Sequence, residues 1–168
     1  YLLNGMGRSQ VQVGLLLSAW PLAAGLTAQI SGRLSDRYPV GLLGTFGMAI
    51  ATTGLVTLTF LTPESSNIDV ILRLMVVGIG LGVFGAPNNR AILLSAPRER
   101  AGGAGGMQQL CRQIGSAIGT ALVAVVFGLA AGGRANFHSA NLAITIGAGF
   151  TVVAGCVSSF RIGRARES

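Results

Sequence analysis

Residues 31–39, S-G-R-L-S-D-R-Y-P, decide how the rest of the chain is interpreted. This stretch is short and charged and ends in proline. Long runs almost free of charge flank it, at residues 11–30 and 40–61. A run of about 20 apolar residues is long enough to cross a bilayer as a helix. Residues 31–39 are therefore predicted to form a tight turn between two membrane-spanning helices.

The composition supports a membrane protein. Of the 168 residues, 51% are hydrophobic and only 10% are charged, whereas soluble domains carry about 25% charged residues. The 26 glycines favour close packing of membrane helices. The predicted fold is an all-α membrane protein, a single transmembrane domain over residues 1–168. Its five predicted spans are residues 11–31, 40–61, 70–96, 104–129 and 138–160.

The distribution of arginine predicts the topology. The net charge is +7 and all 12 basic residues are arginines. A basic soluble protein would suggest nucleic-acid binding, but these arginines lie in short loops, so the positive-inside rule explains them and no nucleic-acid partner is expected. With the 31–39 loop in the cytoplasm, the cytoplasmic segments hold Arg33, Arg37, Arg98, Arg100, Arg161, Arg164 and Arg166, and the outer segments hold Arg8 and Arg134. The C-terminus is therefore predicted to be cytoplasmic.

The chain begins without an initiator Met, on the apolar tripeptide Tyr1-Leu2-Leu3. Because residue 1 is predicted to lie outside, we expect an earlier span and a missing N-terminal part of the protein. Restoring that span would give six spans, with both ends in the cytoplasm. Six spans form half of a common transporter plan, in which two similar bundles rock about a central site.

Three stretches resemble the major facilitator superfamily. The loop residues Gly32, Asp36 and Arg37 match the G-x-L-x-D-R loop signature of that family. Arg73, followed by Gly78, Gly80 and Gly82, is similar to the R-x-x-x-G-x-G pattern of an equivalent helix. Residues 102–122, G-G-A-G-G-M-Q-Q-L-C-R-Q-I-G-S-A-I-G-T-A-L, resemble the penultimate helix of the fourteen-span drug:proton antiporters. The chain as a whole is similar to the C-terminal part of such a protein.

The resemblance implies most of one six-helix half of the major facilitator fold, in a bacterial inner membrane. It also implies proton-coupled efflux of small amphiphilic compounds by alternating access. Two alternatives stay open: a truncated fragment that does not transport, and a nutrient facilitator of the same superfamily. The sequence has no Ser-His-Asp set, metal-ligand cluster or nucleotide-binding loop, so no enzyme activity, metal or cofactor is expected. No Asp or Glu lies within a predicted span, so the coupling carboxylate is expected in the missing part.

Asp36 has two interpretations. In the first, it pairs with Arg33 or Arg37 inside a solvated turn. In the second, which the resemblance implies, it latches neighbouring helices on the cytoplasmic side. A carboxylate within reach of arginines is stabilising in either arrangement.

A polar strip follows the fourth predicted span. Gln109, Arg112, Gln113, Ser116 and Thr120 recur at helical spacing and share a face. Arg112 lies about eight residues inside the helix, or roughly 12 Å at about 1.5 Å per residue. A charge at that depth should face the bundle interior or a water-filled cavity. The strip is predicted to line a substrate cavity or gate; the alternative is that Arg112 snorkels to the cytoplasm while the glutamines bond neighbouring helices.

Two prolines lie inside predicted spans and are expected to kink them. Pro21 is near the centre of the first span, and Pro87 is in the inner part of the third. Each lacks the N–H that would close a helical hydrogen bond. Asn88 and Asn89 are expected to satisfy the carbonyl that Pro87 leaves free, and Arg90 is expected to extend to the cytoplasmic interface.

Three further residues have ordinary structural interpretations. Arg73 follows Asp69 by four positions, the spacing of an ion pair on one helix face. Cys111 and Cys156 lie in apolar runs without metal-ligand spacing, and are predicted to be small buried hydrophobic residues.

Overall fold

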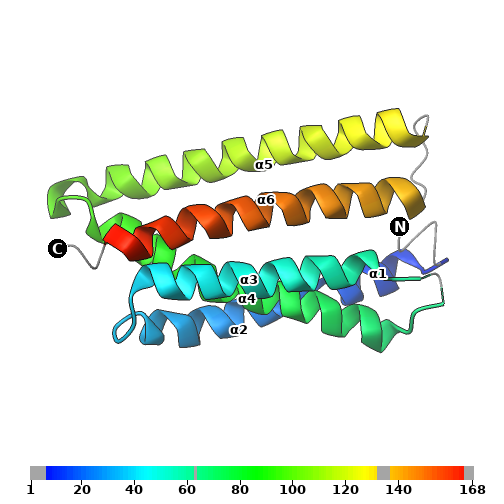
Figure 1. Cartoon of the computed structure of the whole chain (residues 1–168), viewed down its shortest axis with the longest axis horizontal. Coiled ribbons are helices and arrows are strands. Elements are labelled where there is room, and N and C mark those ends of the chain that lie inside the picture. The colour runs from blue at the N-terminus through cyan, green and yellow to red at the C-terminus, as the bar shows by residue number, and fades with distance from the viewer. Residues whose placement is uncertain (1–6, 63, 132–136, 165–168) are drawn as a thin grey trace.

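The computed structural model describes residues 7–62, 64–131 and 137–164. Regular secondary structure in these residues is entirely helical (Figure 1). The elements in chain order are α1 (Gln10–Leu17), α2 (Ala19–Leu34), α3 (Val40–Thr59), α4 (Asn67–Leu94), the short 3-10 helix η1 (Arg98–Arg100), α5 (Ala101–Ala131) and α6 (Phe137–Arg164).

Five helical segments of the described chain are long and apolar enough to cross a membrane. They are Gln10–Leu34, Val40–Thr59, Asn67–Leu94, Ala101–Val126 and Asn141–Ser158. Figure 1 shows these helices running along one common direction. The predicted all-α membrane fold with about five spans is confirmed.

Two helices begin before their predicted boundaries, one of them at a polar cap. α4 begins at Asn67, before the predicted start at residue 70, because the Ser66 hydroxyl accepts a 3.2 Å hydrogen bond from the Asp69 N–H. α5 begins at Ala101, before the predicted start of that span at residue 104. Hydropathy alone does not detect such caps, because they depend on local hydrogen bonds.

Ser18 divides the first span into α1 and α2. Backbone bonds still bridge the division: the Ser18 N–H donates to the Gly14 carbonyl at 3.0 Å, and the Ser18 carbonyl accepts from the Leu22 N–H at 3.2 Å. Pro21 lies in the first turn of α2, so the bond it lacks is the one to Leu17, the last residue of α1. The interruption therefore falls within one turn of this proline.

α4 packs against α2 and α3 at backbone contact distance. A Cβ added to Gly47 of α3 would lie 2.6 Å from the Phe84 nitrogen of α4. On the opposite side of α4, a Cβ at Gly78 would collide with the Trp20 carbonyl of α2. Small residues permit this approach, and the close packing compensates for the absence of a hydrophobic driving force between helices in lipid. α2, α3 and α4 thus form the tightly packed core.

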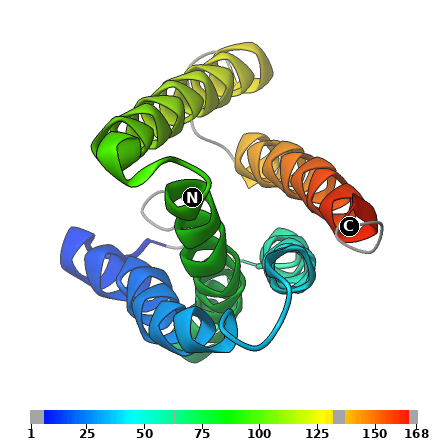
Figure 2. The ribbon, with the colours of Figure 1, turned by 90° about the vertical axis from the view of Figure 1, so that its left-hand side faces the viewer.

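α6 covers α3, whereas α5 lies at the edge of the bundle. The Thr52 and Thr151 hydroxyls hydrogen bond at 2.9 Å between α3 and α6. Every residue of α5 from position 109 to position 125 is exposed. In Figure 2, α5 lies apart from α2 and α3. The described part of the chain therefore leaves nearly the whole surface of this helix uncovered.

Candidate functional site

The loop after α2 is a compact turn closed by backbone hydrogen bonds. The Ser35 N–H donates to the Ser31 carbonyl at 2.9 Å, and the Tyr38 N–H donates to the Leu34 carbonyl at 3.0 Å. These bonds continue the helical pattern past the end of α2 and fix the course of the chain. The turn therefore holds Asp36 in a defined position at one end of the bundle.

Asp36 forms an ion pair with Arg90, on the last part of α4. Arg90 also donates a hydrogen bond to the Ser35 hydroxyl at 3.2 Å. Pairing of Asp36 with Arg33 or Arg37 inside the loop, one of the two expected arrangements, is wrong, because the turn directs the carboxylate toward α4. The Asp36 and Arg90 side chains are 57% and 48% exposed, so the pair contributes about 0–1 kcal/mol to stability.

Pro87 lies within α4, which continues past it to Leu94, and is fully buried. Its missing N–H would have bonded to the carbonyl of Val83, four residues earlier. That carbonyl accepts a 2.8 Å hydrogen bond from the Ser31 hydroxyl of α2. Ser31 therefore satisfies it, a partner that the expectation for Asn88 and Asn89 did not include. This role of Ser31 was not predicted, although the position of Pro87 identifies the free carbonyl.

Asn89 joins α4 to α5. Its side-chain oxygen accepts a hydrogen bond from the Gln108 amide, near the start of α5. The neighbouring Arg90 bonds to the loop after α2. Consecutive residues at one end of α4 thus contact two different elements, and this end of α4 connects the loop signature to the helix that bears the polar strip.

The predicted polar strip lies on α5 and is exposed along its length, at Gln109, Arg112, Gln113, Ser116 and Thr120. The Thr120 hydroxyl donates to the Ser116 carbonyl of its own helix at 2.9 Å. Exposed apolar side chains occupy the rest of the same helix, among them Leu110, Ile114 and Ile118. The described residues therefore do not enclose this strip.

A second ion pair lies at the opposite end of α4, between two residues of that helix. Arg73 and Asp69 pair at 2.9 Å, which confirms the predicted contact between positions four apart. Arg73 also donates to the Thr57 carbonyl of α3, so it ties the ends of two helices together. In addition, the Arg8 guanidinium donates to the Ser65 carbonyl at 3.1 Å, which connects the segment before α1 to the loop before α4.

Cys111 and Cys156 are thiols that form no disulfide with each other, and both are exposed. The prediction that they are buried is wrong, because an apolar run in a membrane helix can face outward as readily as inward. Among the residues that the structure describes, no three His, Cys, Asp or Glu side chains are grouped so that they could hold a metal ion. Arg134 and Arg166, which were used to predict topology, lie outside the described residues.

A profile described as Major Facilitator Superfamily matches residues 1–120. The chain belongs to this superfamily. The predicted family is therefore confirmed, and the match includes both the Asp36 turn and the polar strip of α5.

Individual relatives match different fractions of the chain. The Uncharacterized transporter YebQ of Escherichia coli is 42% identical over 167 residues, which cover 99% of this chain and 35% of the relative. The Riboflavin transporter RibZ of Clostridioides difficile is 32% identical, over 71% of this chain and 26% of the relative. The Quinolone resistance protein NorB of Staphylococcus aureus (strain Newman) is 27% identical, over 89% of this chain and 33% of the relative.

The chain therefore spans between about a quarter and about a third of the length of these curated relatives. The comparison with solved structures gave no significant match.

Proposed function

We propose that this chain forms most of one half-bundle of a transporter that exports small amphiphilic compounds by alternating access. The observation that supports this proposal is the exposed polar face of α5, with Arg112 well inside a membrane-length helix. An arginine at such a depth is costly in contact with lipid and is expected to face protein or water. A second bundle from the rest of the protein would complete a cavity around this face.

The proposed cavity wall consists of Gln109, Arg112, Gln113, Ser116 and Thr120. Arg112 would attract anionic or hydrogen-bond-accepting groups of a substrate, and the amides and hydroxyls would supply further hydrogen bonds. The apolar side chains of the same helix would contact the hydrophobic part of an amphiphilic compound.

The topology proposed for this protein places the Asp36 turn and the C-terminus in the cytoplasm of a bacterial cell, in the inner membrane. In that orientation Asp36 and Arg90 would act as a latch that stabilises one of the two access states. Gly32 leaves room beside this turn, since a Cβ there would meet nothing within 4 Å.

Export and coupling to protons are the finer part of the proposal. A relative named as a quinolone resistance protein supports export. A relative named as a riboflavin transporter supports the second candidate, a nutrient transporter. The carboxylate needed for proton coupling would lie elsewhere in the protein. Within the described membrane-length helices, the acidic residue Asp69 lies in the first turn of α4, at a helix end.

Transport by the full-length protein tests these alternatives. Cells that express it would be loaded with a fluorescent amphiphilic compound, and separately with riboflavin, with and without a proton uncoupler. Proton-coupled export should lower the accumulation of the amphiphilic compound in cells that express the protein. The uncoupler should raise that accumulation again. Increased uptake of riboflavin, with unchanged accumulation of the amphiphilic compound, would contradict export and support the nutrient transporter.

A further inference from the structure

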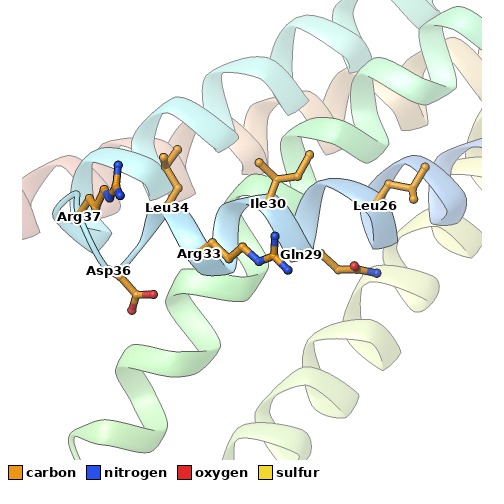
Figure 3. A pocket seen from close by; sticks show the side chains of 7 residues that line it. All are labelled: Leu26, Gln29, Ile30, Arg33, Leu34, Asp36 and Arg37. Atoms are coloured by element: carbon orange, nitrogen blue, oxygen red, sulfur yellow. The ribbon is translucent and has the colours of Figure 1, made fainter.

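A hollow of about 810 Å³ lies beside the end of α2 and the turn that follows it. It is lined by Leu26, Gln29, Ile30, Arg33, Leu34, Asp36 and Arg37. Figure 3 shows the three apolar side chains projecting from α2 in a similar direction, with Arg33 extending along the helix toward Gln29. The hollow thus has a charged end at the turn and a mainly apolar end further along the helix, where Gln29 also lies and toward which Arg33 extends.

The charged end has an excess of positive charge. Asp36 points away from Arg37 in Figure 3, and its carboxylate is paired with Arg90 of α4. Among the carboxylates that the structure describes, none forms an ion pair with Arg33 or Arg37. Two guanidinium groups are therefore available to an anion, and guanidinium is the side-chain group best matched to phosphate geometry.

The apolar end is a stripe along the outer surface of α2. Leu26, Ile30 and Leu34 recur every four residues, so they lie on one helix face, and they are 66%, 65% and 39% exposed. Eight residues of helix extend about 12 Å at about 1.5 Å per residue. The stripe begins next to the arginines and runs into the membrane-spanning part of the helix.

We propose that this hollow binds an anionic phospholipid. The phosphate would lie between Arg33 and Arg37, and one acyl chain would follow Leu34, Ile30 and Leu26. A free phosphate ion would use only the arginines and would leave the apolar stripe uncovered. A lipid satisfies both ends at once, and basic groups at the ends of membrane helices attract anionic headgroups.

The test uses the full-length protein, purified in detergent and depleted of lipid. Thermal unfolding is followed after addition of phosphatidylglycerol, phosphatidylcholine or inorganic phosphate. We expect phosphatidylglycerol to raise the unfolding temperature by a few degrees more than phosphatidylcholine, because a ligand that binds only the folded state stabilises it. Inorganic phosphate should not reproduce the effect.

Variants locate the site. Arg33→Gln combined with Arg37→Gln should remove most of the selective effect of phosphatidylglycerol. Ile30→Ser should reduce it while leaving both arginines in place. Arg100→Gln is the matched control, because Arg100 is an exposed arginine of η1, outside the lining of the hollow, and this variant should respond as the wild type does.

Four results would overturn the proposal. They are an equal response to the two lipids, an equal response to inorganic phosphate, and a loss of response in Arg100→Gln as large as in the double variant. The fourth is a large fall in the unfolding temperature of the double variant without lipid, which would mean that another part of the protein fills the hollow.

Discussion

Asp36, in the turn after α2, is paired with Arg90 of α4 across 54 residues of sequence. Both side chains are about half exposed, so the pair adds little to the free energy of unfolding. Its importance is positional: it fixes the turn against the end of α4, where the neighbouring Asn89 bonds to Gln108 of α5. The ion pair and this bond to α5 therefore lie next to each other at one end of α4.

The first prediction concerns this pair. Asp36→Asn and Arg90→Gln should each change transport about fivefold, because an interaction of about 1 kcal/mol shifts a conformational equilibrium by roughly that factor. The unfolding temperature should change little. Initial transport rates at matched membrane levels are the measurement.

The charge-swapped variant, Asp36→Arg with Arg90→Asp, should return transport part of the way to the wild-type rate. Glu99→Gln is the control, since Glu99 is an exposed carboxylate of η1 outside this pair. An unaltered transport rate in both single variants would exclude the latch.

The second prediction concerns the bond between Ser31 and the Val83 carbonyl. Ser31 is only 2% exposed and its bond to the Val83 carbonyl is partly buried, so Ser31→Ala should remove a partner from that carbonyl and cost about 1–3 kcal/mol. The cost should be smaller in a Pro87→Ala background, because the substituted alanine would supply a backbone N–H to the same carbonyl. Thermal unfolding of the two single variants and the double variant measures this coupling.

Ser18→Ala provides the comparison, because the Ser18 hydroxyl makes a solvent-exposed hydrogen bond to the Leu15 carbonyl of the preceding helix, α1. This variant should unfold near the wild-type temperature. Strictly additive effects of Ser31→Ala and Pro87→Ala would show that the hydroxyl does not compensate for the proline.

The third prediction contrasts two glycines of α4. Gly80 meets the backbone of Ala51 on α3, so Gly80→Ala should force the helices apart and cost about 1–3 kcal/mol. A Cβ on Gly85 would meet nothing within 4 Å, so Gly85→Ala should gain up to about 1 kcal/mol of helix propensity. Unfolding temperatures in detergent distinguish them, and equal destabilisation would contradict the assignment of Gly80 as the specific close contact.

The fourth prediction concerns the proposed cavity wall. Arg112→Ala should lower transport by about 10- to 100-fold, because a hydrogen bond to a charged group contributes about 1.5–3 kcal/mol. Arg112→Lys should retain more activity because it keeps the charge. Ile118→Ala on the same exposed helix should have a smaller effect, because it removes apolar contact and no hydrogen-bonding group. Normal transport by Arg112→Ala would exclude a cavity or gate role for this residue.

Features that depend on local physics could be predicted from the sequence. The five spans follow from apolar length, because a bilayer core sets a minimum helix length. The Asp69–Arg73 pair follows from helix geometry, because residues four apart share a face. The family also follows from the sequence, because the loop signature and the glycine pattern are linear motifs.

Which distant groups meet could be learned only from the packing of the helices. The sequence offered Asp36 several arginine partners, including those of its own loop. The shape of the turn selects Arg90 of α4. The Ser31 hydroxyl reaches the Val83 carbonyl across 52 residues, because backbone packing brings α2 and α4 together. Hydropathy does not distinguish a helix face that meets lipid from one that meets protein. The arrangement of the helices was therefore needed to show that nearly the whole α5 surface, Arg112 included, is left uncovered by its described neighbours.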